Sequence, residues 1–100
     1  MRQHSDTGFL SVPGAQLYYE VAGAGDSLVF IHAGVADSRM WDEQFAVFSQ
    51  RHRVVRYDTR GFGRSKTEDV EFSNHEDLRD LLDHLEIEKA SLVGASRAGG

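Results

Sequence analysis

Short β-prone runs alternate with segments of helical periodicity along most of this chain, and this alternation restricts the fold more than any other feature. The runs at residues 28–31, 53–57 and 90–94 are short, and the first is continuously apolar, as in a strand that is covered on both faces. Segments with helical spacing of apolar residues separate them. The order strand, helix, strand, helix, strand predicts an α/β layered sheet with right-handed crossovers.

The first helical segment follows a candidate capping pair. Asp37 and Ser38 can accept hydrogen bonds from the N–H groups of a first helical turn. Residues 39–50 are then predicted to form an amphipathic helix. Three aromatic residues mark its apolar face: Trp41, Phe45 and Phe48.

The second helical segment has the clearest periodicity in the chain. Ser73 and Glu76 have the spacing of a capping box. Four leucines then recur at i, i+3, i+4 and i+7, as on the buried face of a helix: Leu78, Leu81, Leu82 and Leu85. The other face is acidic, and we expect it to be solvated: Glu76, Asp77, Asp80, Asp83 and Glu86.

A β-hairpin is predicted before these elements. Residues 9–12 are β-prone, a Pro-Gly turn follows, and residues 16–21 alternate between apolar and polar side chains. Residues 1–8 are polar, and we expect them to be a loose N-terminal tail. Residues 9–100 then belong to one domain.

Composition excludes several classes of function. The chain has no cysteine, which excludes disulfides, iron–sulfur clusters, thiolate metal sites and a cysteine nucleophile. Its 11 Lys and Arg stand against 16 Asp and Glu, the opposite of the usual balance in a nucleic-acid-binding protein. There is neither a membrane-length apolar run nor a signal-peptide core, so we expect a cytoplasmic protein without membrane contact. No histidine pair has metal-ligand spacing, and we expect no metal site.

Ser96 is the candidate nucleophile. It stands in the sequence GASRA at residues 94–98, where a β-prone run ends in Gly-x-Ser-x-small. A serine at a sharp strand-to-helix corner exposes its Oγ at the edge of the sheet, and only small neighbours let strand and helix approach. The N–H of Arg97, at the start of the next helix, would favour developing negative charge. The alternative is a serine in an ordinary turn of small residues.

Three motifs follow the three β-prone runs in order. They are FIHAG at residues 30–34, YDTRGFGRS at residues 57–65 and LVGASRAGG at residues 92–100. Together they resemble the oxyanion loop, the Asp-x-Arg-Gly-x-Gly-x-Ser loop and the nucleophile elbow of the α/β-hydrolase family. The resemblance covers residues 9–100. It implies an α/β fold, the N-terminal portion of a mostly parallel α/β-hydrolase sheet with about five strands and two helices, incomplete at the C-terminus.

The resemblance implies roles for residues at the reaction centre. Ser96 would be the nucleophile, and the N–H groups of Gly34 and Arg97 would form the oxyanion hole, with Ala33 or Val35 as register alternatives to Gly34. The Arg97 side chain would contact either a substrate carboxylate or an acid elsewhere in the protein.

The resemblance also implies supporting residues. His32 would be a structural hydrogen-bonding residue, and Asp58 and Arg60 would brace the loop after the fourth strand. Asp58 as the acid of the catalytic triad is the less favoured alternative, because the family takes that acid from later in the chain. Ala33 and Ala98 depart from the family's usual glycines.

Within the family, the chain looks closest to enol-lactone hydrolases and esterase-like members. The implied reaction is hydrolysis of a small-molecule ester or lactone without a cofactor. Haloperoxidases and C–C bond hydrolases are neighbouring alternatives. Haloalkane dehalogenases fit less well, because their nucleophile is an aspartate and this position is Ser96.

A base and an orienting acid are still needed, and in this family both follow the nucleophile. We expect them beyond residue 100, because none of the five histidines occupies the family's catalytic position. The isolated chain is then expected to be inactive. The alternative is a truncated, non-catalytic module that binds a partner or itself through an open sheet edge. A phosphate site at residues 61–66 is a third hypothesis, but its glycines lack the spacing of known phosphate loops.

Overall fold

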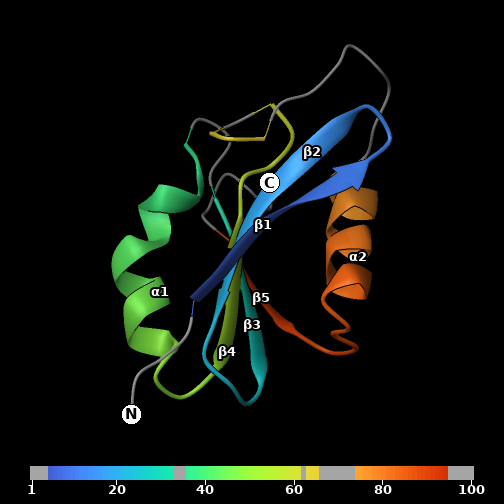
Figure 1. Ribbon diagram of the computed structural model, residues 1–100. Helices are drawn as coiled ribbons and strands as arrows, with labels where there is room; N and C mark the ends of the chain where they lie inside the picture. Colours follow the sequence, from blue (N-terminus) through green and yellow to red (C-terminus); the bar gives the residue numbers. More distant parts are fainter. Residues whose placement is uncertain (1–4, 33–35, 62, 66–73, 95–100) are drawn as a thin grey trace.

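The computed structural model describes residues 5–32, 36–61, 63–65 and 74–94. Within them, five strands form one sheet with a helix against each face (Figure 1). The strands are β1 Ser5–Val12, β2 Ala15–Ala22, β3 Ser27–Ile31, β4 Arg53–Tyr57 and β5 Ser91–Gly94. The helices are the 3-10 helix η1 Ser38–Trp41 and the α-helices α1 Asp42–Phe48 and α2 Asn74–His84. In the part of the chain so described, no helix is long and apolar enough to span a membrane.

The predicted hairpin is confirmed, but it is longer than expected. β1 pairs antiparallel with β2 from Ser5 opposite Ala22 to Val12 opposite Ala15. The expectation of a loose tail is therefore wrong for residues 5–8, which belong to this ladder. Strands pair through their backbone N–H and C=O groups, so β1 can continue along β2 beyond residues 9–12, which predicted the strand.

The sheet is mixed, and its order is β1-β2-β4-β3-β5. β4 pairs antiparallel with β2, whereas β3 pairs parallel with both β4 and β5. The crossover from β3 to β4 moves toward β2, and the crossover from β4 to β5 moves the other way, past β3. Crossovers of one hand in opposite directions place their helices on opposite faces, as α1 and α2 are. The predicted α/β class is confirmed.

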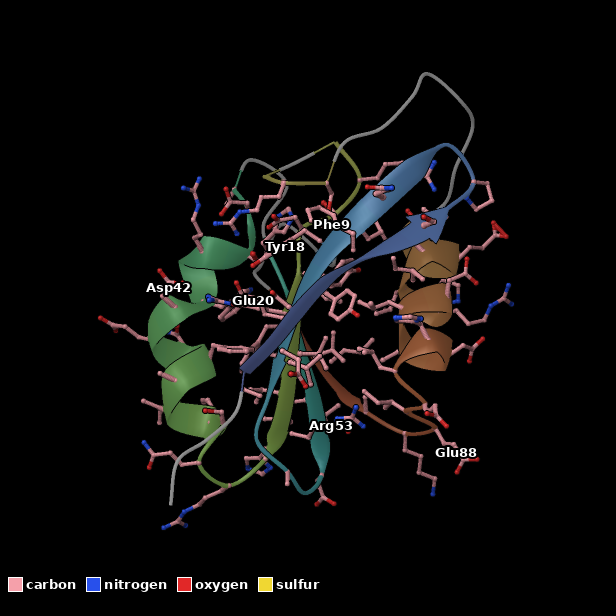
Figure 2. The ribbon with its side chains drawn as sticks, in the orientation of Figure 1. Phe9, Tyr18, Glu20, Asp42, Arg53 and Glu88 are labelled. Carbon is pink, nitrogen blue, oxygen red and sulfur yellow. The ribbon has the colours of Figure 1, made fainter. Side chains whose placement is uncertain are left out.

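Two apolar clusters fill the space between the sheet and its helices, and side chains from both faces point toward α1 and α2 (Figure 2). Strand residues alternate between the clusters, because successive side chains of a strand point to opposite faces. The α1 cluster contains Ala22, Phe30, Phe45 and Val54. The α2 cluster contains Val21, Val29, Val55, Tyr57, Leu78, Leu81 and Ile87.

The first predicted helix begins as a tighter 3-10 turn. The Asp37 side chain accepts a hydrogen bond from the N–H of Arg39, as a capping residue does. The following α1 ends at Phe48. Trp41 lies in the 3-10 turn and stacks on Phe30 of β3 at 5.0 Å between ring centroids, so the predicted apolar face packs on the sheet.

The leucine helix is confirmed as α2. Leu78 and Leu81 are buried against the sheet. The expectation that the acidic face is solvated is wrong for Asp77, which is 4% exposed and paired with Arg60. The i+3 and i+4 pattern identifies the apolar side of a helix. It does not report that Arg60, which is distant in the chain, forms a buried ion pair with Asp77. Ser73 of the predicted capping box lies outside the described residues.

Candidate active site at the carboxyl ends of the parallel strands

The carboxyl ends of the three parallel strands lie in one row. Ile31, the last residue of β3, pairs with Tyr57 of β4 and with Gly94 of β5. The chain leaves β3 toward α1 and leaves β4 toward α2, on opposite faces of the sheet. A point where neighbouring connections diverge in this way forms the usual ligand crevice of an open α/β sheet.

The loop after β4, residues 58–65, is closed by Ser65. The Ser65 hydroxyl donates to the carbonyl oxygen of Asp58 at 2.6 Å and accepts from the N–H of Tyr18 at 2.7 Å. The N–H of Gly61 donates to the Ser65 carbonyl at 2.9 Å. Ser65, the last residue of the loop motif, therefore links the two ends of the loop and connects the loop to β2.

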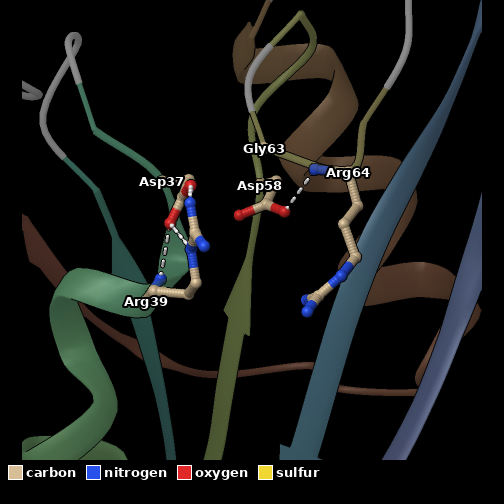
Figure 3. Close-up of a pocket in the computed structure, with 5 residues that line it drawn as sticks. All are labelled: Asp37, Arg39, Asp58, Gly63 and Arg64. Carbon is tan, nitrogen blue, oxygen red and sulfur yellow. Dashed lines mark hydrogen bonds and ion pairs between the residues drawn. The ribbon is translucent and has the colours of Figure 1, made fainter.

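The carboxylate of Asp58 lies inside this loop and is 2% exposed. Its Oδ1 accepts from the N–H of Ser38 at 2.7 Å, and its Oδ2 accepts from the N–H of Arg64 at 2.8 Å (Figure 3). Gly63 has φ +51°, and a Cβ there would overlap the Asp58 carboxylate and lie 2.9 Å from Asp37 Cβ. Glycine is needed at this position both for its backbone conformation and for the space it leaves.

His32, directly after β3, is 2% exposed. Its Nε2 accepts from the N–H of Thr59 at 2.9 Å and lies 3.0 Å from the Thr59 hydroxyl. Because Nε2 accepts from a backbone N–H, the proton of the neutral ring is on Nδ1. The Nε2 lone pair is then unable to take a proton from a serine hydroxyl.

The Arg60 side chain contacts α2 and the turn between β1 and β2. Its Nε and terminal nitrogen donate to the two carboxylate oxygens of Asp77 at 3.1 and 2.9 Å. The other terminal nitrogen donates to the carbonyl of Pro13 at 2.7 Å. One side chain thus joins the loop to α2 and to the turn of the hairpin.

A pocket of about 250 Å³ opens beside this loop (Figure 3). It is lined by Asp37, Arg39, Asp58, Gly63 and Arg64. Hydrogen bonds from the Arg39 side chain lower the pKa of Asp37 from 3.8 to about 2. Asp37 and Arg39 therefore form an ion pair at neutral pH, and the Asp58 carboxylate already has two backbone donors.

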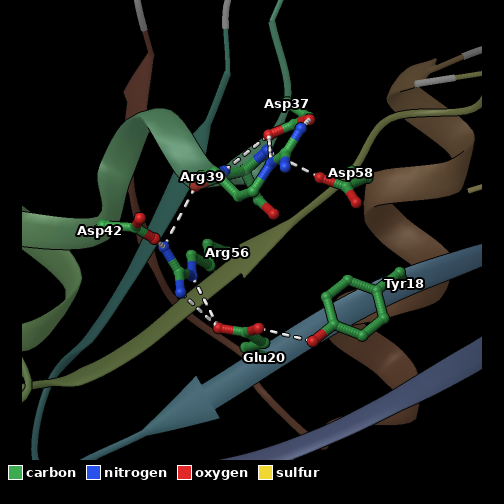
Figure 4. Close-up of polar contacts among 8 residues, drawn as sticks. Tyr18, Glu20, Asp37, Arg39, Asp42, Arg56 and Asp58 are labelled. Carbon is green, nitrogen blue, oxygen red and sulfur yellow. Dashed lines mark hydrogen bonds and ion pairs between the residues drawn. The ribbon is translucent and has the colours of Figure 1, made fainter. Parts of the chain in front are cut away.

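A charged network lies on the α1 side of the sheet (Figure 4), and no pattern in the sequence predicted it. Arg56 of β4 contacts the carboxylates of Glu20 and Asp42 at 2.6 and 2.5 Å, and its guanidinium lies 4.4 Å from the centre of the Phe45 ring. The Tyr18 hydroxyl donates to Glu20 at 2.5 Å. Burial, and then this hydrogen bond, raise the pKa of Tyr18.

The structure brings together the predicted supporting residues His32, Asp58 and Arg60 around one loop. The predicted nucleophile and oxyanion donors lie outside the described residues: Ser96, Arg97 and Gly34, with the alternatives Ala33 and Val35. Asp77 is a site-supporting residue that the sequence analysis missed. Among the described residues, no group of three His, Asp or Glu side chains could hold a metal ion.

The described geometry agrees with what comparisons with known proteins find. Residues 28–100 match the model of the alpha/beta hydrolase family. The 3-oxoadipate enol-lactonase 1 of Acinetobacter baylyi is 43% identical over 75 residues, which are 73% of this chain and 28% of that protein.

Two solved structures are also similar over nearly the whole chain. A hydrolase from Pseudomonas aeruginosa PA01 superposes with a TM-score of 0.83 at 33% identity, over 94% of this chain and 38% of that one. Est816, described as an N-acyl homoserine lactone degrading enzyme, superposes with a TM-score of 0.86 at 30% identity, over 92% of this chain and 37% of that one. This chain therefore spans less than two fifths of the length of each of these relatives.

Proposed function

Because this chain belongs to the alpha/beta hydrolase family, we propose that the natural protein hydrolyses an ester or lactone bond through an acyl-enzyme on Ser96. The proposed substrate is a small molecule, and the reaction needs no cofactor. The relatives named for enol-lactone and homoserine-lactone chemistry support this substrate class.

The register of the parallel strands is the observation that carries the proposal. Ile31 and Gly94 are paired, so the residues that follow them leave adjacent strands at the same edge. Adjacent strands are about 4.8 Å apart, and three residues of chain can span about 10 Å. The proposal assigns Ser96 and the N–H of Gly34, which follow these two strand ends in the chain, to the same substrate carbonyl.

The proposed chemistry gives each of these groups one role. The Ser96 Oγ attacks the acyl carbon, its proton passes to a base, and the carbonyl oxygen becomes an oxyanion that accepts from the N–H groups of Gly34 and Arg97. The base then protonates the departing alkoxide oxygen. Water attacks the acyl-enzyme in the same way and releases the carboxylic acid and free Ser96.

The base is proposed to lie outside these 100 residues. The contact between Nε2 of His32 and the N–H of Thr59 supports this, because it occupies the lone pair that a general base would use. An imidazole and an orienting acid from another part of the natural protein would complete the triad. We accordingly expect the 100-residue chain by itself to be inactive.

A fluorophosphonate probe tests the proposal on the full-length natural protein. We expect one phosphonate adduct, at Ser96, and turnover of p-nitrophenyl butyrate that is lost in Ser96→Ala. Ser91→Ala is the matched control, because Ser91 is an exposed serine at the start of the same strand, β5. Labelling of Ser96→Ala at the wild-type rate, or no labelling of the wild type, would overturn the proposed function.

The second candidate function is a binding module that self-associates through a sheet edge. One observation favours it: β5 forms an edge of the described sheet, and its Leu92 is 55% exposed. Sedimentation of the purified 100-residue chain at increasing concentration tests it. Growth in mass that Leu92→Lys abolishes would support the module, and a constant monomer mass would exclude it.

A further inference from the structure

The outer edge of β1 presents backbone groups that the hairpin does not use. β1 is the outermost strand on its side of the sheet, and Phe9 in its middle stands opposite Tyr18 (Figure 1). The Tyr18 N–H donates to the Ser65 hydroxyl, and the Tyr18 carbonyl accepts from the N–H of Asp58, so both groups point away from β1. Phe9 and Tyr18 are therefore a non-hydrogen-bonded pair, and the N–H and C=O of Phe9 face the outer edge.

The same orientation recurs at every second residue of an antiparallel strand. Thr7 and Ser11 thus present their N–H and C=O at the edge together with Phe9, and these groups have no hydrogen-bond partner among the described residues. Edge strands are commonly protected by proline, by lysine or by a bulge. β1 contains no proline or lysine, and its pairing with β2 is continuous. The edge is therefore open to a further strand.

Helix α2 packs beside β1, and one flank of the helix faces the hairpin. Near the start of the helix, Asp77 binds Arg60, which also donates to the Pro13 carbonyl in the hairpin turn. At the end of the helix, Nε2 of His84 lies 3.2 Å from the Tyr19 hydroxyl. Residues seven apart lie on the same side of a helix, so this flank follows the hairpin along most of α2.

The flank of α2 that faces the hairpin is acidic. Asp80 comes three residues after Asp77 and four before His84, and therefore lies between them on this flank. Glu76 and Asp83 are the surface neighbours of Asp80 at i−4 and i+3, and both are exposed. Carboxylates thus border the edge of β1 on its α2 side.

The two faces of β1 differ in character. Asp6 shares a face with Leu10, which packs against the α2 cluster, because alternate residues of a strand point the same way. Asp6 is exposed and is the only charged residue of β1. On the opposite face, Phe9 is 52% exposed and makes an edge contact with Tyr18, at 5.4 Å between ring centroids. The edge therefore has carboxylates on one side and an exposed aromatic ring on the other.

We propose that the outer edge of β1 binds an extended polypeptide segment in which basic residues alternate with apolar ones. The segment adds a sixth strand to the described sheet through the edge N–H and C=O groups. Its basic side chains face Asp6 and Asp80, and its apolar side chains face Phe9. A second copy of this chain fits less well, because antiparallel pairing of two β1 strands would place the acidic flanks of both α2 helices on the same side of the sheet. This binding does not depend on the chemistry of Ser96.

The test uses the isotope-labelled, full-length natural protein and a capped peptide of about seven residues in which lysine alternates with valine. We expect the amide signals of Thr7, Phe9 and Ser11 to shift during the titration. Hydrogen exchange of these amides should slow by about 10-fold or more at saturation. A control peptide with glutamate in place of lysine should bind about 10-fold more weakly or not at all, and added salt should weaken binding of the lysine peptide.

Thr7→Pro and Thr7→Val separate strand addition from other modes of binding. Proline removes an edge N–H, whereas valine keeps it, and an edge strand tolerates proline where the nitrogen faces outward. We expect Thr7→Pro to raise the Kd of the lysine peptide about 5- to 10-fold relative to Thr7→Val. Equal Kd values for these two variants would overturn strand addition.

Asp80→Asn tests the charge without altering the backbone of β1. We expect it to raise the Kd of the lysine peptide about 2- to 5-fold. Asp26→Asn is the matched control, because Asp26 is an exposed aspartate that directly precedes β3, and its Kd should equal that of the wild type. Equal Kd values for Asp80→Asn and Asp26→Asn would contradict the role of the acidic flank.

Three results of the titration itself would overturn the proposal. The first is no shift in β1 at about 1 mM lysine peptide, and the second is equal binding of the lysine and glutamate peptides. The third is a set of shifts confined to α2, which would mean that the peptide contacts the acidic surface without pairing with β1. Signals of Thr7, Phe9 and Ser11 that change with protein concentration before any peptide is added would assign the edge to a second copy instead.

Discussion

The guanidinium of Arg60 and the carboxylate of Asp77 form a two-point ion pair in which the side chains are only 2% and 5% exposed. Their backbones belong to different elements, the loop after β4 and the helix α2. The pair therefore ties the position of the loop to a helix that packs on the opposite face from α1. A buried pair of this kind costs much when one partner is removed, because the other is left charged and unpaired.

Asp77→Asn should lower the free energy of unfolding of the natural protein by about 3 kcal/mol, because it leaves the Arg60 guanidinium buried without its counter-charge. Urea denaturation measures this loss. Asp83→Asn is the control on the same helix, where the side chain is exposed, and it should change the free energy of unfolding by less than about 0.5 kcal/mol. Equal effects of the two variants would show that the ion pair contributes nothing specific.

Gly63→Ala should destabilise the protein by about 2 kcal/mol or more. Part of this cost is the left-handed backbone, with φ +51°, and part is the overlap of a new Cβ with the Asp58 carboxylate. Urea denaturation measures the loss of stability. The p-nitrophenyl butyrate assay measures whether displacement of the Asp58 carboxylate also changes activity. A loss of stability below about 0.5 kcal/mol would mean that the loop adapts without strain.

Acid should weaken the contribution of Asp37 to stability. Its pKa in the folded protein is about 2, below the ordinary 3.8, first because the Arg39 side chain donates hydrogen bonds to it. A lowered pKa stabilises the fold fully above about pH 4, and the effect is lost as the pH falls toward 2. The difference in stability between the wild type and Asp37→Asn should therefore be smaller at pH 3 than at pH 6, by urea denaturation. Asp26→Asn, at an exposed site, is the control for replacing a carboxylate by an amide.

Arg56→Lys should lower the free energy of unfolding by about 1–2 kcal/mol although the charge is kept. A lysine reaches one carboxylate at a time, whereas Arg56 contacts Glu20 and Asp42 together and stacks on Phe45. Thermal or urea denaturation measures the loss. Arg79→Lys, on the exposed side of α2, should be neutral within about 0.5 kcal/mol. A neutral Arg56→Lys would contradict a role for the planar guanidinium.

The sequence predicted the elements well where the pattern of side chains repeats. β3, β4 and β5 lie within about two residues of their predicted bounds, and α2 contains three of the four leucines that predicted it, because apolar runs and the 3.6-residue period report local burial directly. The first four residues of β1 were missed because they pair through their backbone. The 3-10 start of the first helix was missed because a capping residue does not distinguish the two kinds of turn.

Only part of the candidate site could be predicted from the sequence. The motif after β4 could be read from the sequence, including the glycines, Asp58 and Ser65. Its partners could not be read, because Asp77, Ser38 and Tyr18 come from elements between 17 and 47 residues away in the chain. No local period reports contacts over such separations.

By itself, the sequence determined the alternation of strands and helices and the family, since periodicity and short motifs are local properties of the chain. The tertiary structure alone decided the strand order, the burial of Asp77, and the row in which Ile31, Tyr57 and Gly94 end their strands. These depend on which distant backbones hydrogen-bond and on which charges must be paired once water is excluded. The free energy of these contacts arises only in the assembled sheet with its two helices, and no single segment provides it.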